Sequence, residues 1–374
     1  MAAITTVGIV GAGAAGTTLA AYLARGGIDV EVLERTPEPS TLGSGLTLQG
    51  NALRLLKDLG VWEQLESHGY GFSELGIRAP DPDGTVLTVM DDMRTGGPDL
   101  PSTLGIYRPD LARIVRERAA ELGARFVYGA QVEGLDDDGE DVTVHLADGT
   151  TSRYALVVGA DGLHSTVRSL IGITEEPRRT GMGIWRAFVP RPAEVTRTDL
   201  VYGGPVYIAG YCPTTDDTCY AYLVEDVQDR TGADGPAIMR ELAAGYGGPW
   251  KEIRESIDDG ANVNYTSFTT HFVEGDWHRG RVVIIGDAAH SCPPTIAQGA
   301  AQSFEDAAVL AELLLGTETL DDALFAEFLE RRRARAKRVV EASTQLGQWL
   351  LDHDRSGDPG ALIGEIGALV SEPA

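Results

Sequence analysis

The sequence predicts an α/β protein in which one mostly parallel sheet is assembled from separate parts of the chain and a mainly antiparallel β region is inserted between them. The first observation is an N-terminal unit of about 30 residues that reads strand, glycine turn, helix and strand. The second is the return of fully apolar strands, typical of a parallel sheet, at 155–160 and 282–285. The third is a change of character from 173 to 275, where short segments rich in Tyr, Trp, Thr and Phe alternate with Pro and Asp turns.

The elements are expected in a clear order. A β-branched run predicts the first strand, helix-forming residues that end at Gly26 predict the first helix, and an Asp-Gly-Thr turn predicts a later hairpin. The expected elements are strand 4–10, helix 17–27, strand 28–34, helix 51–59, helix 108–123, strand 124–132, hairpin 141–154, strand 155–160, strand 282–285 and helices from 320 to 351.

Length and composition indicate a globular protein in water. The chain has 374 residues, enough for one large or two ordinary domains, with 43% hydrophobic and 23% charged residues. No window reaches the roughly 18 to 20 unbroken apolar residues of a spanning helix, and the first strand begins within about three residues of Met1. We therefore expect no membrane span, no signal peptide and a cytoplasmic location.

The charge balance excludes several partners. Lys and Arg number 31 against 56 Asp and Glu, a net charge of −25, which repels nucleic acids and anionic membranes. The basic run at 331–338 lies in a helical pattern and is predicted to be a solvated helix face. The cysteines Cys212, Cys219 and Cys292 have no Cys-x-x-Cys spacing and no paired histidines, so no metal site is expected.

The glycine turn "GAGAAG" predicts a dinucleotide site. Gly11 permits the tight turn, Gly13 allows a pyrophosphate to approach the backbone, and Gly16 lets the helix pack on the strand. The helix beyond, through Ala14 and Ala15, supplies free backbone N–H groups. Glu34 ends the next strand, where an acid that binds a ribose belongs.

Three later motifs carry a family resemblance: "RPDLARIV" with Arg108, "VVGADGLHSTVR" with Asp161 and Arg168, and "GRVVIIGDAAHSCPPTIAQG" with Asp287. Together they resemble the flavoprotein aromatic hydroxylases, the single-component FAD-dependent monooxygenases similar to salicylate and p-hydroxybenzoate hydroxylases. The resemblance covers roughly residues 4–60, 104–172 and 276–345 and is specific there.

The resemblance implies roles for individual residues. Glu34 and Arg35 would hold the adenosine ribose of a tightly bound FAD, and Arg108 would reach the diphosphate and ribityl region. Asp161 belongs to a motif implicated in handling both FAD and NAD(P)H, the transient co-substrate. Gly286 and Asp287 would meet the ribityl chain, Pro293 would border the reactive face of the flavin, and the helix start at Gln298, Gly299 and Ala300 would present N–H groups to flavin N1 and C2=O.

The implied architecture is a Rossmann-like, discontinuous FAD-binding domain with an inserted, mainly antiparallel substrate domain and C-terminal helices. The expected FAD-binding domain comprises 1–70, 101–172 and 276–351. The expected substrate domain comprises 71–100 and 173–275. The sequence leaves open the role of the tail at 352–374.

The segment Val206–Val224 is predicted to be a hairpin that turns about Thr215 and Asp216. The residue numbers of cross-strand partners would then add up to 431, which places Tyr211 opposite Tyr220 and Cys212 opposite Cys219. No disulfide is expected between the two cysteines in a reducing cytosol. Period two would place four tyrosines on one face: Tyr207, Tyr211, Tyr220 and Tyr222. That face would either floor an aromatic pocket or form an outer or subunit-contacting surface.

The predicted polar contacts to the substrate are Tyr207, Tyr211, Tyr222 and His271. Arg186 is the nearest candidate for a carboxylate clamp, and the absence of Lys and Arg from the hairpin favours a neutral phenol or heterocycle. His290 is expected to make a structural hydrogen bond, and Trp277 is expected to be packing.

The predicted function is NAD(P)H-dependent hydroxylation of an electron-rich aromatic ring, a phenol or N-heterocycle, by O₂ through a flavin C4a-hydroperoxide. Alternatives are a flavin-dependent reductase or epoxidase of the same fold and an FAD-loaded protein that binds an aromatic without turnover. A halogenase is disfavoured because "WRAFVP" lacks the second Trp and the Ile of the Trp-x-Trp-x-Ile-Pro signature. A monomer or homodimer is expected.

Overall fold

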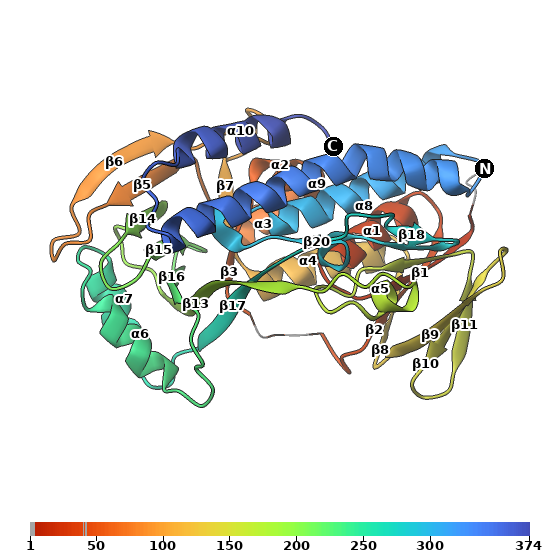
Figure 1. Ribbon diagram of the computed structural model, residues 1–374, viewed down its shortest axis with the longest axis horizontal. Coiled ribbons are helices and arrows are strands. Elements are labelled where there is room, and N and C mark those ends of the chain that lie inside the picture. The colour runs from red at the N-terminus through yellow and green to blue at the C-terminus, as the bar shows by residue number, and fades with distance from the viewer. Residues whose placement is uncertain (1–3, 40, 42) are drawn as a thin grey trace.

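The computed structural model describes residues 4–39, 41 and 43–374, and it has the mixed α/β fold that the sequence predicts (Figure 1). Its six-stranded sheet has the order β18-β19-β12-β1-β2-β8, and every neighbouring pair except β18 with β19 is parallel. The strands are β18 (His278–Arg279), β19 (Val282–Ile284), β12 (Leu156–Gly159), β1 (Thr6–Val10), β2 (Asp29–Glu34) and β8 (Arg125–Tyr128). Three distant parts of the chain therefore build one sheet.

Helices cover this sheet. α1 packs against both α4 and α8, and the 30-residue helix α9 runs along much of the long axis of the molecule (Figure 1). Within the described residues, none of the helices is long and apolar enough to span a membrane. The helices here are α1 (Ala14–Arg25), α2 (Gly50–Asp58), α3 (Trp62–His68), α4 (Arg108–Glu121), α5 (Thr166–Leu170), α8 (Gly299–Gly316), α9 (Asp322–Leu351) and α10 (Pro359–Ser371).

An eight-stranded sheet forms the second layer, in the order β20-β17-β13-β16-β15-β14-β5-β6, and only β14 and β5 pair in parallel. One face packs against α6 (Gly235–Ala243) and α7 (Trp250–Ser256) around Trp185 and Tyr211. The strands are β5 (Glu74–Arg78), β6 (Val86–Asp91), β13 (Arg178–Pro190), β14 (Thr198–Tyr202), β15 (Ile208–Pro213), β16 (Thr218–Asp226), β17 (Val263–Phe272) and β20 (His290–Ser291).

Two three-stranded sheets complete the fold. One has the order β11-β10-β9, from β9 (Val132–Asp137), β10 (Val142–Leu146) and β11 (Thr151–Tyr154). The other has the order β3-β7-β4, from β3 (Gly45–Gln49), β7 (Thr103–Tyr107) and β4 (Gly69–Phe72). The latter lies directly against the eight-stranded sheet, because a Cβ on Gly105 would come within 1.9 Å of the Pro213 carbonyl oxygen.

The predicted hairpin register is wrong by one residue. Cross-strand partners sum to 432, so that Tyr211 lies opposite Ala221 and Cys212 opposite Tyr220. Pro213 pairs with Cys219 at the end of the ladder, so an odd number of residues, 214–218, lies between these partners and is centred on Asp216. A shift of one residue in this sum moves one strand's side chains to the opposite face relative to the other strand. Tyr211 therefore lies on the α6–α7 face and Tyr220 and Tyr222 on the other, and Cys212 and Cys219 also lie on opposite faces.

Candidate functional site

The glycine turn brings α1 very close to the parallel sheet. Gly11 has φ +105°, and a Cβ there would lie 2.4 Å from the Ala160 carbonyl oxygen at the end of β12. A Cβ on Gly16 would lie 2.0 Å from the Gly11 carbonyl oxygen. Both positions therefore need glycine for the approach of helix to strand that the motif predicts.

The start of α1 is open. The first helical hydrogen bond joins Thr17 N–H to Gly13, no side chain caps the helix, and no acidic residue lies in its first turn. Gly13 and Ala14 are exposed. The backbone N–H groups of the first turn are therefore available to an anion.

Glu34 lies beside this turn, where the sequence places it. One of its carboxylate oxygens accepts from the backbone N–H of Ala12 at 2.9 Å, and the other accepts from Thr36 N–H at 2.9 Å. Arg35, the other predicted ribose contact, is exposed next to it.

The Gly286–Asp287 turn meets the glycine turn, although Gly286 follows Gly11 by 275 positions (286 − 11). Gly286 has φ +60°, and a Cβ there would lie 2.9 Å from both Ala15 Cβ and Ser303 Oγ. The turn is thus wedged between the first residues of α1 and α8. Two segments predicted to bind the cofactor therefore lie side by side.

Asp287 has an unusual environment. Its side chain is exposed while its neighbours Gly286 and Ala288 are buried. Desolvation among the surrounding protein atoms raises its pKa, and the charges of His290 and Arg108 act in the opposite direction. A carboxylate that is accessible but surrounded by buried residues is suited to accept a hydrogen bond from a hydroxyl group of a bound molecule.

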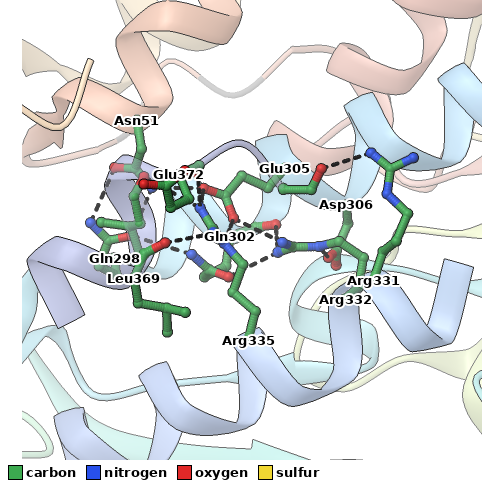
Figure 2. Close-up of polar contacts among 12 residues, drawn as sticks. Asn51, Gln298, Gln302, Glu305, Asp306, Arg331, Arg332, Arg335, Leu369 and Glu372 are labelled. Atoms are coloured by element: carbon green, nitrogen blue, oxygen red, sulfur yellow. Dashed lines mark hydrogen bonds and ion pairs between the residues drawn. The ribbon is translucent and has the colours of Figure 1, made fainter. Parts of the chain in front are cut away.

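The start of α8 is also open. No side chain caps it and its first turn has no acidic residue, so the N–H groups of Gly299 and Ala300 are available. The side chain of Gln298 is fully buried and bonds to Asn51, so any cofactor contact there falls to its backbone (Figure 2). Of the two prolines in this turn, Pro293 is buried and its carbonyl accepts from the Ser343 hydroxyl, whereas Pro294 is exposed.

Asp161 organises its own loop. Its carboxylate accepts from the Ser165 hydroxyl at 2.5 Å and from Thr166 N–H at 2.7 Å, at the start of α5. The buried guanidinium of Arg168 donates to the carbonyls of Leu163 and Ala288, both at 3.1 Å. Arg168 therefore ties the Asp161 loop to the Asp287 turn.

The face of the eight-stranded sheet opposite α6 and α7 carries Arg186, the candidate carboxylate clamp of the sequence analysis, bonded to Tyr220. Arg186 Nε donates to the hydroxyl of Tyr220 at 3.1 Å, and another guanidinium nitrogen donates to Thr266. Among the described residues no carboxylate pairs with Arg186. Burial raises the pKa of Tyr220 to about 12, so its hydroxyl stays protonated and can donate.

This face adjoins the cofactor segments. Phe188, next to Tyr220 across the strands, has its ring centroid 4.5 Å from that of Tyr107, and Arg108 follows Tyr107 directly. Tyr222 pairs with Arg186 and its ring centroid lies 5.1 Å from that of Tyr220. Tyr222 and Tyr207 pack against the same apolar cluster of this face, so both are predicted tyrosine contacts that it retains.

Tyr211 and His271, the remaining predicted contacts, lie elsewhere. Tyr211 is fully buried on the α6–α7 side, where its hydroxyl donates to Asp199 at 2.9 Å. Tyr207 precedes β15 and donates to Asp226 at 2.8 Å. His271 is on β17, and alternation along this strand turns it away from the face of Thr266. Burial lowers the pKa of His271 to about 4.

The basic run at 331–338 is not simply a solvated face, which corrects the sequence prediction. Arg332 is 0% exposed and Arg335 is 8% exposed. Arg332 donates to Glu305 at 2.8 Å and to Asp306 at 2.7 Å (Figure 2). The signal in the sequence was the pair Glu305–Asp306 inside an apolar helix, since buried carboxylates require partners.

His290 makes the structural hydrogen bond that the sequence predicts. Its Nε2 lies 2.7 Å from Asp306, which also accepts from the backbone N–H of Gly286 at 2.8 Å. Trp277 is buried and packs against Phe272, His290 and Phe328. Asp306 thus anchors the turn that carries Asp287.

Asp306 makes the stability of the protein depend on pH. Burial acts to raise its pKa, but the charges of His290 and Arg332 outweigh burial and lower it from 3.8 to about 2. Because the folded-state pKa lies below the unfolded one, we expect Asp306 to contribute about 2 kcal/mol above pH ~4 and to lose it as pH falls toward 2. Urea unfolding should show that the free energy of unfolding of the wild type exceeds that of Asp306→Asn by less and less as pH falls across that range. An advantage that does not change with pH would contradict this assignment.

These features fit FAD. Two uncapped helix starts match its anionic groups, and Glu34 lies where a ribose belongs. Asp287 is an exposed carboxylate between buried neighbours and accepts no hydrogen bond from the described residues. The chain matches the family model described as "FAD binding domain" over residues 4–343 and therefore belongs to that family of FAD-dependent aromatic hydroxylases. The protein is accordingly an FAD-dependent monooxygenase.

Individual relatives agree with this class. The chain is 31% identical to "Putative FAD-dependent monooxygenase YetM" of Bacillus subtilis, over 97% of this chain and 98% of the relative. It is 29% identical to "6-hydroxynicotinate 3-monooxygenase" of Bordetella bronchiseptica, with 90% of each chain covered. In fold it resembles HpxO of Klebsiella pneumoniae complexed with FAD and uric acid, with a TM-score of 0.83, 22% identity, and 99% and 97% of the two chains covered.

Proposed function

We propose that this monooxygenase hydroxylates an electron-rich aromatic ring, a phenol or N-heterocycle, with NAD(P)H and O₂ as co-substrates. The observation that carries the proposal is the position of Gly286 between the starts of α1 and α8, with an aromatic sheet face alongside. One relative named above is a 6-hydroxynicotinate monooxygenase, and the solved HpxO complex holds uric acid, which supports a ring of this kind.

The residues that would hold FAD follow from the geometry. The N–H groups of Ala14 and Ala15 would bind the pyrophosphate above Gly13, and Glu34 with Arg35 would bind the ribose. Arg108, Asp161 with its loop, and Asp287 would line the middle of the cofactor. The N–H groups of Gly299 and Ala300 would face flavin N1 and C2=O, with the turn through Pro293 beside the ring.

We also propose a domain division on the basis of the two large sheets. The six-stranded sheet would be the core of a Rossmann-like FAD-binding domain made of 1–70, 101–172 and 276–351. The eight-stranded sheet would be the core of the substrate domain, made of 71–100 and 173–275. The chain would act in the cytoplasm as a monomer or homodimer, and light scattering tests the assembly.

Bound FAD supplies the redox chemistry: it accepts hydride from NAD(P)H and activates O₂. The chain must orient the ring, exclude water and hold the substrate oxygen. Phe188, Tyr220 and Tyr222 provide an aromatic surface for this purpose. Arg186 and the protonated Tyr220 hydroxyl provide two donors for one oxygen.

This arrangement supports a substrate with an anionic oxygen, either a carboxylate or a deprotonated ring hydroxyl. In a chain of net charge −25, Arg186 has only hydroxyl partners among the described residues. A guanidinium in such a place gains most from a charge-assisted hydrogen bond. The proposal thus departs from the preference for a neutral substrate in the sequence analysis.

Replacing Arg186 with methionine is expected to raise KM for an anionic aromatic by about 10- to 100-fold, because one charge-assisted hydrogen bond is lost. The matched control is a neutral analogue without the anionic group, whose KM should change little. Steady-state kinetics with both compounds measures the difference. Equal effects on both would assign Arg186 to the fold and not to recognition.

The function is tested by anaerobic stopped-flow reduction with NADH and with NADPH, in the presence and absence of phenols, hydroxypyridines and aromatic carboxylates. A compound of this panel that is a substrate should accelerate flavin bleaching many-fold. After air is admitted, that compound should be converted to its hydroxylated product. Reduction of an added olefin without O₂ uptake would favour the reductase alternative. An aromatic that binds without turnover under any condition would favour the binding-protein alternative.

A further inference from the structure

The C-terminal helix α10 docks onto the body of the protein in a specific way. Its Leu362, Ile366 and Val370 pack in one cluster with Val339 and Leu346 of α9. The carbonyls of its last turn accept from side chains of α2 and α9. The segment whose role the sequence leaves open is therefore an integral part of the fold.

The end of α10 is held by two arginines from other helices. Arg335 of α9 donates to the carbonyls of Leu369 at 2.7 Å and Glu372 at 2.9 Å (Figure 2). Arg54 of α2 donates to the carbonyls of Ser371 at 2.7 Å and Glu372 at 2.8 Å. The last carbonyls of a helix lack partners within it, and α10 has no basic residue in its own last turn. The two guanidinium groups supply the missing donors.

The same arginines belong to a buried ion cluster on α8. Arg335 forms two hydrogen bonds with Glu305, at 2.8 and 2.9 Å, and Arg54 lies 4.0 Å from the same carboxylate. With Arg332 and Asp306 the cluster holds three arginines and two carboxylates, so the arginines outnumber the carboxylates by one, a positive surplus. The negative end of the α10 dipole faces this surplus. Docking of α10 therefore helps to balance the charges.

The cluster continues to the turn before α8. Glu305 accepts from the Asn51 amide at 2.9 Å, and Asn51 and Gln298 exchange two amide hydrogen bonds, at 3.0 and 3.2 Å (Figure 2). Gln298 follows Ala297, whose φ of +53° is unfavourable for a residue with a Cβ. A backbone in that conformation persists only where its surroundings fix it. The amide pair with Asn51 provides that restraint.

We propose that Arg54 and Arg335 are positioning residues for the flavin, and that through them α10 fixes the open start of α8. The chain of contacts runs from the α10 carbonyls to Glu305, then to Asn51 and Gln298, and ends at Gly299. This inference rests on the proposed function in one respect, namely that the flavin lies at the start of α8.

Arg338 offers a matched control. It ties α9 to α10, as Arg335 does, because its guanidinium forms two hydrogen bonds of 2.6 Å with Glu365 of α10. Within the described residues, neither Arg338 nor Glu365 bonds to Glu305. We expect Arg54→Gln to weaken binding of FAD to the stripped, full-length protein about tenfold, and Arg338→Gln to leave it within about twofold. FAD titration measures the affinity, thermal unfolding of each apoprotein measures stability, and the visible spectrum of the bound flavin reports its environment.

A second variant tests the helix itself. Ile366→Asp should undock α10 because Ile366 is 3% exposed, and it should expose 352–358 to proteolysis and weaken FAD binding to the extent of Arg54→Gln. FAD affinity equal to wild type in Arg54→Gln or in Ile366→Asp would overturn the proposal. So would equal losses in Arg54→Gln and Arg338→Gln, which would show that docking alone matters. Failure of the wild-type protein to bind FAD at all would instead contradict the cofactor site.

Discussion

Replacing Arg332 with methionine is expected to lower the free energy of unfolding by about 3 to 5 kcal/mol. The guanidinium is 0% exposed and bonds to both Glu305 and Asp306, each at most 1% exposed. Methionine has a similar length but leaves two buried carboxylates short of a countercharge. Urea unfolding near neutral pH measures the loss.

The control for Arg332 lies on the same helix. Arg338 pairs with Glu365 at the surface, so Arg338→Met should cause a much smaller loss, as surface ion pairs contribute little. Similar losses in the two variants would show that water reaches Arg332, Glu305 and Asp306 and screens their charges. Partial recovery in Arg332→Met with Asp306→Asn would support the ionic origin of the effect.

Substitutions at the glycine turn are expected to separate folding from cofactor binding. Gly16→Ala would place a methyl group 2.0 Å from the Gly11 carbonyl oxygen, so α1 must move and both stability and FAD binding should fall. At Gly13 a Cβ would meet only the Ala160 carbonyl oxygen, at 4.0 Å. Gly13→Val should therefore fold normally and lose FAD affinity by about 100-fold or more, because its side chain fills the space of the pyrophosphate.

Apoprotein thermal unfolding and FAD titration distinguish these outcomes. Gly13→Val with normal FAD affinity would place the cofactor elsewhere and would also undermine the assignment of Glu34. Gly16→Ala with wild-type stability would show that α1 can shift on β1 without cost. The Gly13 result tests where the cofactor binds, and the Gly16 result tests how tightly α1 must pack on the sheet.

Local patterns in the sequence predicted most of the scaffold. The strand, glycine turn and helix at 4–25, the apolar strands at β12 and β19, and the helix of Arg108 follow from short-range periodicity and turn chemistry, and the structure has them all. The Gly286–Asp287 turn was predicted from a motif, and the structure places it beside Ala15. These predictions needed only the nearest neighbours along the chain.

The substrate face could not be predicted in the same way. Which side chains it carries depends on whether the residue numbers of cross-strand partners add up to 431 or 432. The five residues between the paired Pro213 and Cys219 set that sum. The turn has no Asn-Gly or Gly-x pair to reveal its type. Tyr211 was therefore placed on the wrong face, and the partnership of Arg186 with Tyr220 was not foreseen.

The sequence by itself determined the class of fold and the position of the glycine turns, because each depends on residue types at fixed local spacing. FAD was indicated by the resemblance of three motifs to a known family. The tertiary structure alone decided which charges are buried. Arg332 and Arg338 stand in one basic run, yet Arg332 is enclosed by α8, whereas Arg338 is only partly buried and pairs with Glu365 at the surface. Burial of a charge depends on what packs against it from distant parts of the chain, and no local pattern carries that information.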